Sequence, residues 1–115
     1  MDDDTLIDLV FIKERNTGSD TIEVHWLTGK SGFTKFGGHR TSPLRSNESA
    51  NGSYQMAHMD DDLVPDLVFV KERNARSRKV ELHWVTGSSD FTKFGGHRVT
   101  GFTLPDADNG TFVIG

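Results

Sequence analysis

The sequence predicts an all-β protein built from two antiparallel repeats of four strands each. The first observation is a duplication at a constant offset of 58 residues: segment 66–74 repeats segment 8–16 with one change, and segment 91–98 repeats segment 33–40 unchanged. The second is a series of short apolar runs bounded by Gly, Asn and Ser turns, and the third is the lack of helical periodicity. A repeat of this kind is expected to bury its apolar faces against neighbouring copies.

Composition excludes several classes of protein. The chain has 115 residues, a net charge of −4 and no cysteine. Its longest basic stretch is residues 76–79, so the charge does not favour nucleic-acid binding, and neither disulfides nor thiolate chemistry are available. No apolar run approaches the roughly 20 residues that a membrane helix needs, and the acidic first residues do not resemble a signal peptide. We therefore expect no membrane insertion and a cytoplasmic location for the chain as it stands, with a secreted origin as the alternative.

Each repeat is expected to contain four strands. Four successive apolar residues, 9–12, indicate a short strand that is covered on both faces. Polar turns at 16–20 and 29–32 and a long Pro, Ser, Asn and Gly loop at 41–52 separate the strands. The strands expected in the first half are 8–15, 21–28, 33–40 and 53–58. Repeat 1 then covers residues 1–58, and repeat 2 covers residues 59–115.

The repeat unit is circularly permuted. Residues 109–115 align with residues 51–57, so the chain ends on a strand that should precede its first residue. Four antiparallel strands per repeat are typical of a β-propeller blade, but two blades cannot close a ring. We expect the last strand to complete the blade at 8–40 of an adjacent copy, so that a trimer has six blades. A tetramer of eight blades and a dimer of two-repeat sandwiches, with the last strand paired inside its own chain, are the alternatives.

Segments 61–74 and 80–89, followed by Phe-Thr-Lys-Phe at 91–94, resemble the FG-GAP or VCBS-like repeats found on secreted bacterial lysozymes and other glycoside hydrolases. The resemblance covers nearly the whole chain, twice. It implies a propeller fold, glycans as the ligand class and a calcium loop between the first two strands of each repeat.

The calcium positions that the resemblance implies are His58, Asp60, Asp62 and Asp66 in the second copy, and Asp2, Asp4 and Asp8 in the first. The pattern departs from the family because a histidine opens the loop and Leu63 replaces the loop glycine. Calcium prefers six to eight oxygen ligands in a sharp loop. We therefore expect no cofactor, with Asp8 and Asp66 accepting backbone N–H groups, and keep calcium at Asp60, Asp62 and Asp66 as the alternative.

A further pattern places glutamate, histidine and tryptophan on one strand of each repeat. Alternation puts histidine and tryptophan on opposite faces of the strand, with the glutamate beside the histidine. Aromatic rings stack on the apolar faces of sugars, and charged side chains bond hydroxyl groups, so this set is a candidate carbohydrate site. Its members are Glu23, His25, Trp26, Glu81, His83 and Trp84. The alternative is that both tryptophans fill the space between repeats and that Glu23 and His25 bond to a neighbouring strand.

Residues Glu23, Trp26, Gly29 and Phe33 are also similar to the repeats of fucose-binding two-blade propellers that form trimers.

A second candidate surface combines the end of the first strand with the end of the third. Its members are Arg15, Asn16, His39 and Arg40, with their repeats Arg73, Asn74, His97 and Arg98. Such groups suit hydroxyl or carboxylate recognition, whereas the alternative is a solvated hairpin end with ordinary ion pairs.

The function predicted from these patterns is that of a lectin, with glycans and further copies of the chain as partners. Repeated sites on one assembly would strengthen weak sugar contacts. The alternative is a propeller scaffold for protein contacts, or an engineered repeat fragment, without a small ligand. We do not expect an enzyme, because no catalytic motif occurs: Gly29-Lys30-Ser31 lacks the glycine that a phosphate loop requires at position 24.

Overall fold

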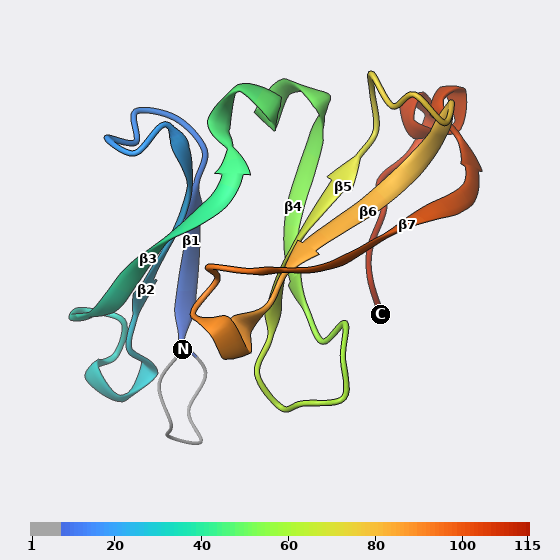
Figure 1. Ribbon diagram of the computed structural model, residues 1–115. Helices are drawn as coiled ribbons and strands as arrows, with labels where there is room; N and C mark the ends of the chain where they lie inside the picture. Colours follow the sequence, from blue (N-terminus) through green and yellow to red (C-terminus); the bar gives the residue numbers. More distant parts are fainter. Residues whose placement is uncertain (1–7) are drawn as a thin grey trace.

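The computed structural model describes residues 8–115, which form two antiparallel β-sheets (Figure 1). The first sheet has the order β1-β2-β3, with β1 at Leu9–Lys13, β2 at Thr21–Leu27 and β3 at Phe36–Arg45. The second sheet has the order β4-β5-β6-β7, with β4 at Gly52–Ala57, β5 at Asp66–Lys71, β6 at Lys79–Val85 and β7 at Phe94–Thr103. The all-β prediction is confirmed at this level.

Short 3-10 helices occupy the turns after β2, β3, β6 and β7. They are η1 at Gly29–Ser31, η2 at Ser46–Asn51, η3 at Gly87–Ser89 and η4 at Leu104–Asn109. The predicted strand at 33–40 is wrong at both ends. At its start, Gly32 and Phe33 have positive φ angles of 69° and 65°, which an extended strand cannot accommodate. The strand instead begins at residue 36 and includes five residues of the predicted loop, up to Arg45.

The two sheets use the same strand register. Leu9 lies opposite Leu27 and Lys13 opposite Glu23, and the corresponding pairs in the second sheet lie 58 positions later. Both sheets also have two register shifts within the last pairing, at equivalent positions, which bend β3 and β7 in the same way. The sheets differ in one respect: β5 has β4 as an extra neighbour, whereas β1 has no described strand on its other edge.

The main core lies between the two sheets. Alternation places the fully buried Ile22 and Val24 on one face of β2, and this face packs against a face of the second sheet that contains Leu67 and Phe69. Leu44 from the added part of β3 joins the same cluster. Two sheets that bury facing side chains in this way are held chiefly by the apolar area that they remove from water.

A second, smaller core lies on the outer face of the second sheet. Val68, Val70, Val80 and Trp84 form it, and the half-buried Phe112 and Ile114 of the C-terminal tail (residues 110–115) pack against it. The tail is extended but belongs to neither sheet, and Figure 1 shows it descending from η4 to the C-terminus beside the second sheet.

The side chain of Gln55 holds this tail in place. Gln55 Nε2 donates to the Phe112 carbonyl at 2.5 Å, and Gln55 Oε1 accepts from the Ile114 N–H at 3.0 Å. Within the described part of the chain, the tail therefore contacts its own second sheet through side chains and makes no strand pairing.

Truncation of Leu67 to alanine should destabilise the fold by about 2–5 kcal/mol, because this fully buried side chain lies in the core between the sheets. Leu63→Ala is the matched control, since Leu63 is 92% exposed and its truncation should change stability by no more than about 0.5 kcal/mol. Urea unfolding at one protein concentration measures both. Equal effects in the two variants would contradict the assignment of the core.

Candidate functional site

The acidic turn before β5 is organised by Asp66. This fully buried carboxylate accepts the N–H of Met59 at 2.9 Å and the N–H of Gly87 at 2.9 Å. In the first repeat, Asp8 accepts the N–H of Gly29 at 3.0 Å. Both aspartates therefore bind backbone N–H groups, as the sequence predicts, and tie the entry of one strand to the turn that follows the next.

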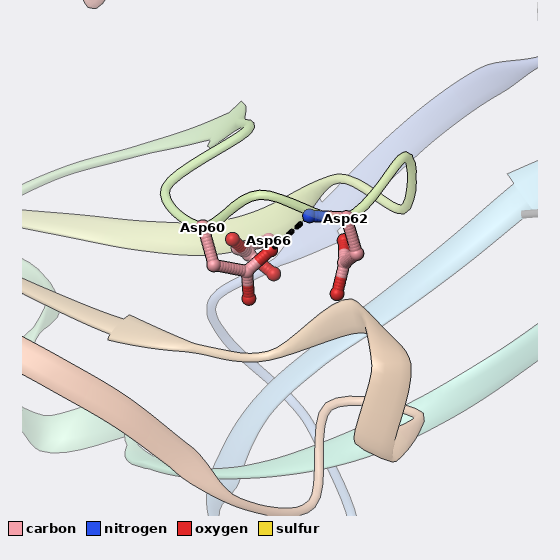
Figure 2. A group of neighbouring side chains, drawn as sticks. All are labelled: Asp60, Asp62 and Asp66. Carbon is pink, nitrogen blue, oxygen red and sulfur yellow. Dashed lines mark hydrogen bonds between the residues drawn. The ribbon is translucent and has the colours of Figure 1, made fainter.

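Asp60, Asp62 and Asp66 form a cluster whose carboxylate oxygens lie within 4.8 Å of one another (Figure 2). Asp60 accepts the Asp62 N–H at 3.1 Å, and Asp62 accepts the Val64 N–H at 2.9 Å. The Asp62 N–H by itself lowers the pKa of Asp60, but burial and the neighbouring carboxyl groups outweigh it, and the pKa of Asp60 is raised.

Of the calcium positions that the sequence suggests, the structure brings these three aspartates together, and the exposed His58 is not among them. Three carboxylates could hold a cation, although calcium usually takes six to eight oxygen ligands and each carboxylate here already accepts a backbone N–H. Asp2 and Asp4 lie outside the described residues.

Each repeat has a glutamate-histidine pair on the face opposite its tryptophan. His25 Nε2 lies 2.9 Å from Glu23 Oε1, and His83 Nε2 lies 2.9 Å from Glu81 Oε1. The next strand adds a second imidazole, so that His25 stacks on His39 and His83 stacks on His97 at centroid distances of 5.2 Å and 5.6 Å.

Hydrogen bonds hold both glutamates in their charged form. The bond from His25, followed by the bond from Ser19, lowers the pKa of Glu23. For Glu81, the bond from Ser77 is the largest cause and the bond from His83 adds to it, so the pKa of Glu81 is also lowered. A carboxylate held in this way fixes the orientation of the histidine ring beside it.

A cleft of about 230 Å³ lies between the two sheets on this histidine face. One wall comes from β3 and η2, and the other comes from β5, β6 and β7. The residues that line it are Pro43, Leu44, Arg45, Glu48, Phe69, Lys71, His83 and Phe94. Lys71 Nζ lies 3.9 Å from Glu48 Oε2 across the cleft, and Glu48 also accepts a bond of 2.7 Å from the Asn51 amide.

His83 is the one lining residue among the sites proposed from sequence, and Arg45, Lys71 and Phe94 were missed. The predicted third strand ends at residue 40, which leaves Arg45 in a loop. The alternation of buried Ser42 and Leu44 with more exposed neighbours is the signal that extends this strand to the cleft.

The structure places the tryptophans in the cores and not at a sugar-binding surface. Trp26 and Trp84 are each 7% exposed. A Cβ atom on Gly37 would clash with the Trp26 ring, so this glycine lets β3 pass directly over the indole. The Arg40 guanidinium lies 5.6 Å from the Trp26 ring centroid, which covers the indole further. Trp26 thus lies between the two repeats, where the alternative places both tryptophans, whereas Trp84 lies in the smaller core on the outer face of the second sheet.

The second predicted surface is divided. His39 and Arg40 lie in the middle of β3, opposite His25 and Val24, because β3 continues to Arg45. The groups near η2 belong to the second repeat: Arg73 Nε donates to the Ala50 carbonyl at 2.8 Å, and Asn74 Nδ2 donates to Asn51 Oδ1 at 2.6 Å. The structure therefore separates the histidine-arginine pairs at 39–40 and 97–98 from the arginine-asparagine pairs at 15–16 and 73–74.

No protein-family model, curated protein or solved structure matches this chain. Within residues 8–115 there is also no helix with the length and apolar character needed to cross a bilayer.

Asp66→Ala should destabilise the fold by about 2–6 kcal/mol, because it leaves two backbone N–H groups without their acceptor in a buried position. Asp61→Ala is the control, since Asp61 is exposed and makes no bond of this kind, and should stay within about 0.5 kcal/mol of the parent protein. Urea unfolding followed by circular dichroism measures the difference. A small effect at Asp66 would show that the turn does not depend on its carboxylate.

Acidification should remove a contribution of Glu23 and Glu81 to stability. Folding lowers the pKa of both carboxyl groups from 4.5, so their contribution is complete above this value and is lost as the pH falls through the folded-state pKa. The variant with Gln at both positions should therefore show a shallower loss of stability between roughly pH 6 and pH 3. Parallel stability profiles for the two proteins would contradict the bonding described above.

Proposed function

We propose that this protein is a lectin, which binds a sugar in the cleft between its two sheets. The observation that supports this proposal is the meeting of an aromatic ring with charged donors and acceptors in one cleft. Phe94 is 57% exposed and lies in the same lining as Lys71, Glu48 and Arg45. A sugar has an apolar C–H face and a rim of hydroxyl groups, so its recognition needs both kinds of side chain.

The polar groups in the cleft are suited to adjacent hydroxyl groups. Lys71 offers only donors, Glu48 offers only acceptors, and His83 is held by Glu81 so that one ring nitrogen is already engaged. A hydroxyl group can accept from one side chain while it donates to another, and bonds to charged groups are the stronger ones. The Lys71–Glu48 distance of 3.9 Å leaves both charges available to a ligand without a tight direct bond.

The size of the cleft favours a small ligand unit. Its volume of about 230 Å³ lies below the roughly 300–1,000 Å³ typical of sites for drug-sized molecules. The cleft therefore suits one sugar residue, such as the end of a glycan chain, more than an extended oligosaccharide.

Binding without catalysis agrees with the electrostatics of the carboxylates. Hydrolysis of a glycosidic bond normally requires a carboxylic acid whose pKa is raised so that it can donate a proton. The pKa of Glu81, which holds the cleft residue His83, is lowered. We therefore assign Glu48 to hydrogen bonding with the ligand and Glu81 to holding His83 in place.

A glycan array identifies the sugar, and calorimetry then tests the cleft. The double variant Lys71→Ala, His83→Ala should weaken binding at this cleft about 10–100-fold, because it removes a charged hydrogen bond and an oriented ring. Lys93→Ala is the control, since Lys93 is exposed and does not line the cleft. The lectin proposal fails if no glycan binds at high protein concentration. The assignment of the cleft fails if the double variant retains both the affinity and the number of sites.

A further inference from the structure

The two repeats bury the same residue types to very different extents. Leu67 and Phe69 of β5 are 0% and 4% exposed, whereas Leu9 and Phe11 at the same positions of β1 are 53% and 60% exposed. The first pair is covered by β4 and by the first sheet. For the second pair, the described residues supply neither a neighbouring strand nor a covering sheet.

The two repeats differ in burial on the opposite side of the molecule as well. Leu44 is 7% exposed because the second sheet covers it, whereas Phe102, its counterpart on β7, is 54% exposed. Each of these uncovered faces has an apolar hollow, of about 530 Å³ beside Phe11 and about 470 Å³ beside Phe102. The two uncovered faces are thus repeats of the two faces that already pack against each other inside the chain.

The tail repeats β4 and keeps one edge free. Gln55 engages the Phe112 carbonyl and the Ile114 N–H, which lie on the same edge of an extended segment. The backbone groups of Thr111 and Val113 point to the other edge, where they make no hydrogen bond within the described residues, and the Val113 side chain is 81% exposed.

We infer that a second copy of this chain docks head to tail on the outer face of the second sheet, and that the tail joins the β1 strand of that copy as its missing fourth strand. The pairing of β4 with β5, in which Tyr54 lies opposite Phe69 and Met56 opposite Leu67, supplies the register. The same register places Phe112 opposite Phe11 and Ile114 opposite Leu9 of the second copy. The contact buries the two exposed apolar faces against each other.

The turn after β5 supports the same contact. Arg73 and Asn74 bond to Ala50 and Asn51 at the end of η2, immediately before β4. Their counterparts Arg15 and Asn16 are exposed, and the counterpart of the η2 end is the end of η4, immediately before the tail. In the assembly, Arg15 and Asn16 of the second copy therefore reach Asp108 and Asn109 of the first copy.

Because the contact joins two different faces, it repeats from copy to copy until a ring closes. Propellers contain about four to eight blades, so two to four copies complete a ring, and three copies give the expected six blades. The native mass should then be three times the 12.8 kDa of one chain.

The same contact creates a second cleft, and this consequence rests on the proposed function. Lys13, His25 and Phe36 repeat Lys71, His83 and Phe94, but residues 8–115 of the same chain place no wall opposite them. For the second copy, the first copy supplies that wall with Phe102, Thr103 and Asp106, which repeat Leu44, Arg45 and Glu48. The ring therefore has two sugar sites per chain, one inside each chain and one between copies.

Cysteine cross-linking tests the register, because the natural chain has no cysteine. Two single-cysteine proteins, Ile114→Cys and Leu9→Cys, are mixed and oxidised, and a disulfide between them is expected because directly opposed strand residues have Cα atoms about 4.5–5.5 Å apart. Ile114→Cys with Lys13→Cys is the matched control. It should not cross-link, because Lys13 lies four residues further along β1, roughly 13 Å away.

The native mass of the unchanged protein gives an independent test that needs no variant. A multiple of the chain mass that is lost when residues 110–115 are removed supports the inference. A folded monomer at tens of micromolar protein, or equal cross-linking of Leu9 and Lys13 variants, overturns it. Neither readout needs a sugar. An assembled ring that binds no glycan would therefore remove the proposed function alone. Calorimetry of the ring with the array ligand counts the sites.

Discussion

The contact between the two sheets is the constraint on which the rest of the structure depends. Both faces of each sheet contain apolar residues. In β2, for example, Val24 lies on one face, and Leu27 lies on the other face beside His25. Each sheet therefore needs to be covered on both sides. The chain supplies one such contact internally. This interface positions the cleft and buries Leu67 and Phe69, whereas Leu9, Phe11 and Phe102 on the equivalent faces are exposed within the described part of the chain.

The all-β class and the duplicated strands could be predicted from the sequence, because short apolar runs such as 9–12 and 67–70 have few structural solutions. The ends of the third strand could not. Phe33 adopts a left-handed conformation that its residue type disfavours, and the polar segment 41–45 resembles a loop although its alternation continues the strand. Local turn geometry and tertiary packing decide both boundaries.

The candidate site was only partly predictable, for a physical reason. Glu81 and His83 are neighbours on one face of one strand, and their spacing alone reveals them. Arg45 and Lys71 belong to different sheets and meet only because the sheets pack, which no linear pattern encodes. The sequence predicts two environments for Trp84, a sugar-binding surface or the interior, and its burial depends on the backbone of Gly95 and Gly96, which passes over its ring.

The two hydrogen bonds from Gln55 to the tail reduce the entropy cost of adding a further strand to it. An unattached terminal segment would lose about 1–2 kcal/mol of backbone entropy per residue on becoming extended. Two hydrogen bonds from the Gln55 side chain to Phe112 and Ile114 already order the tail during folding and so offset part of this entropy loss. A preorganised tail lets a further strand add with less ordering, and the same rigidity makes its free edge a template for unrelated strands and therefore favours aggregation.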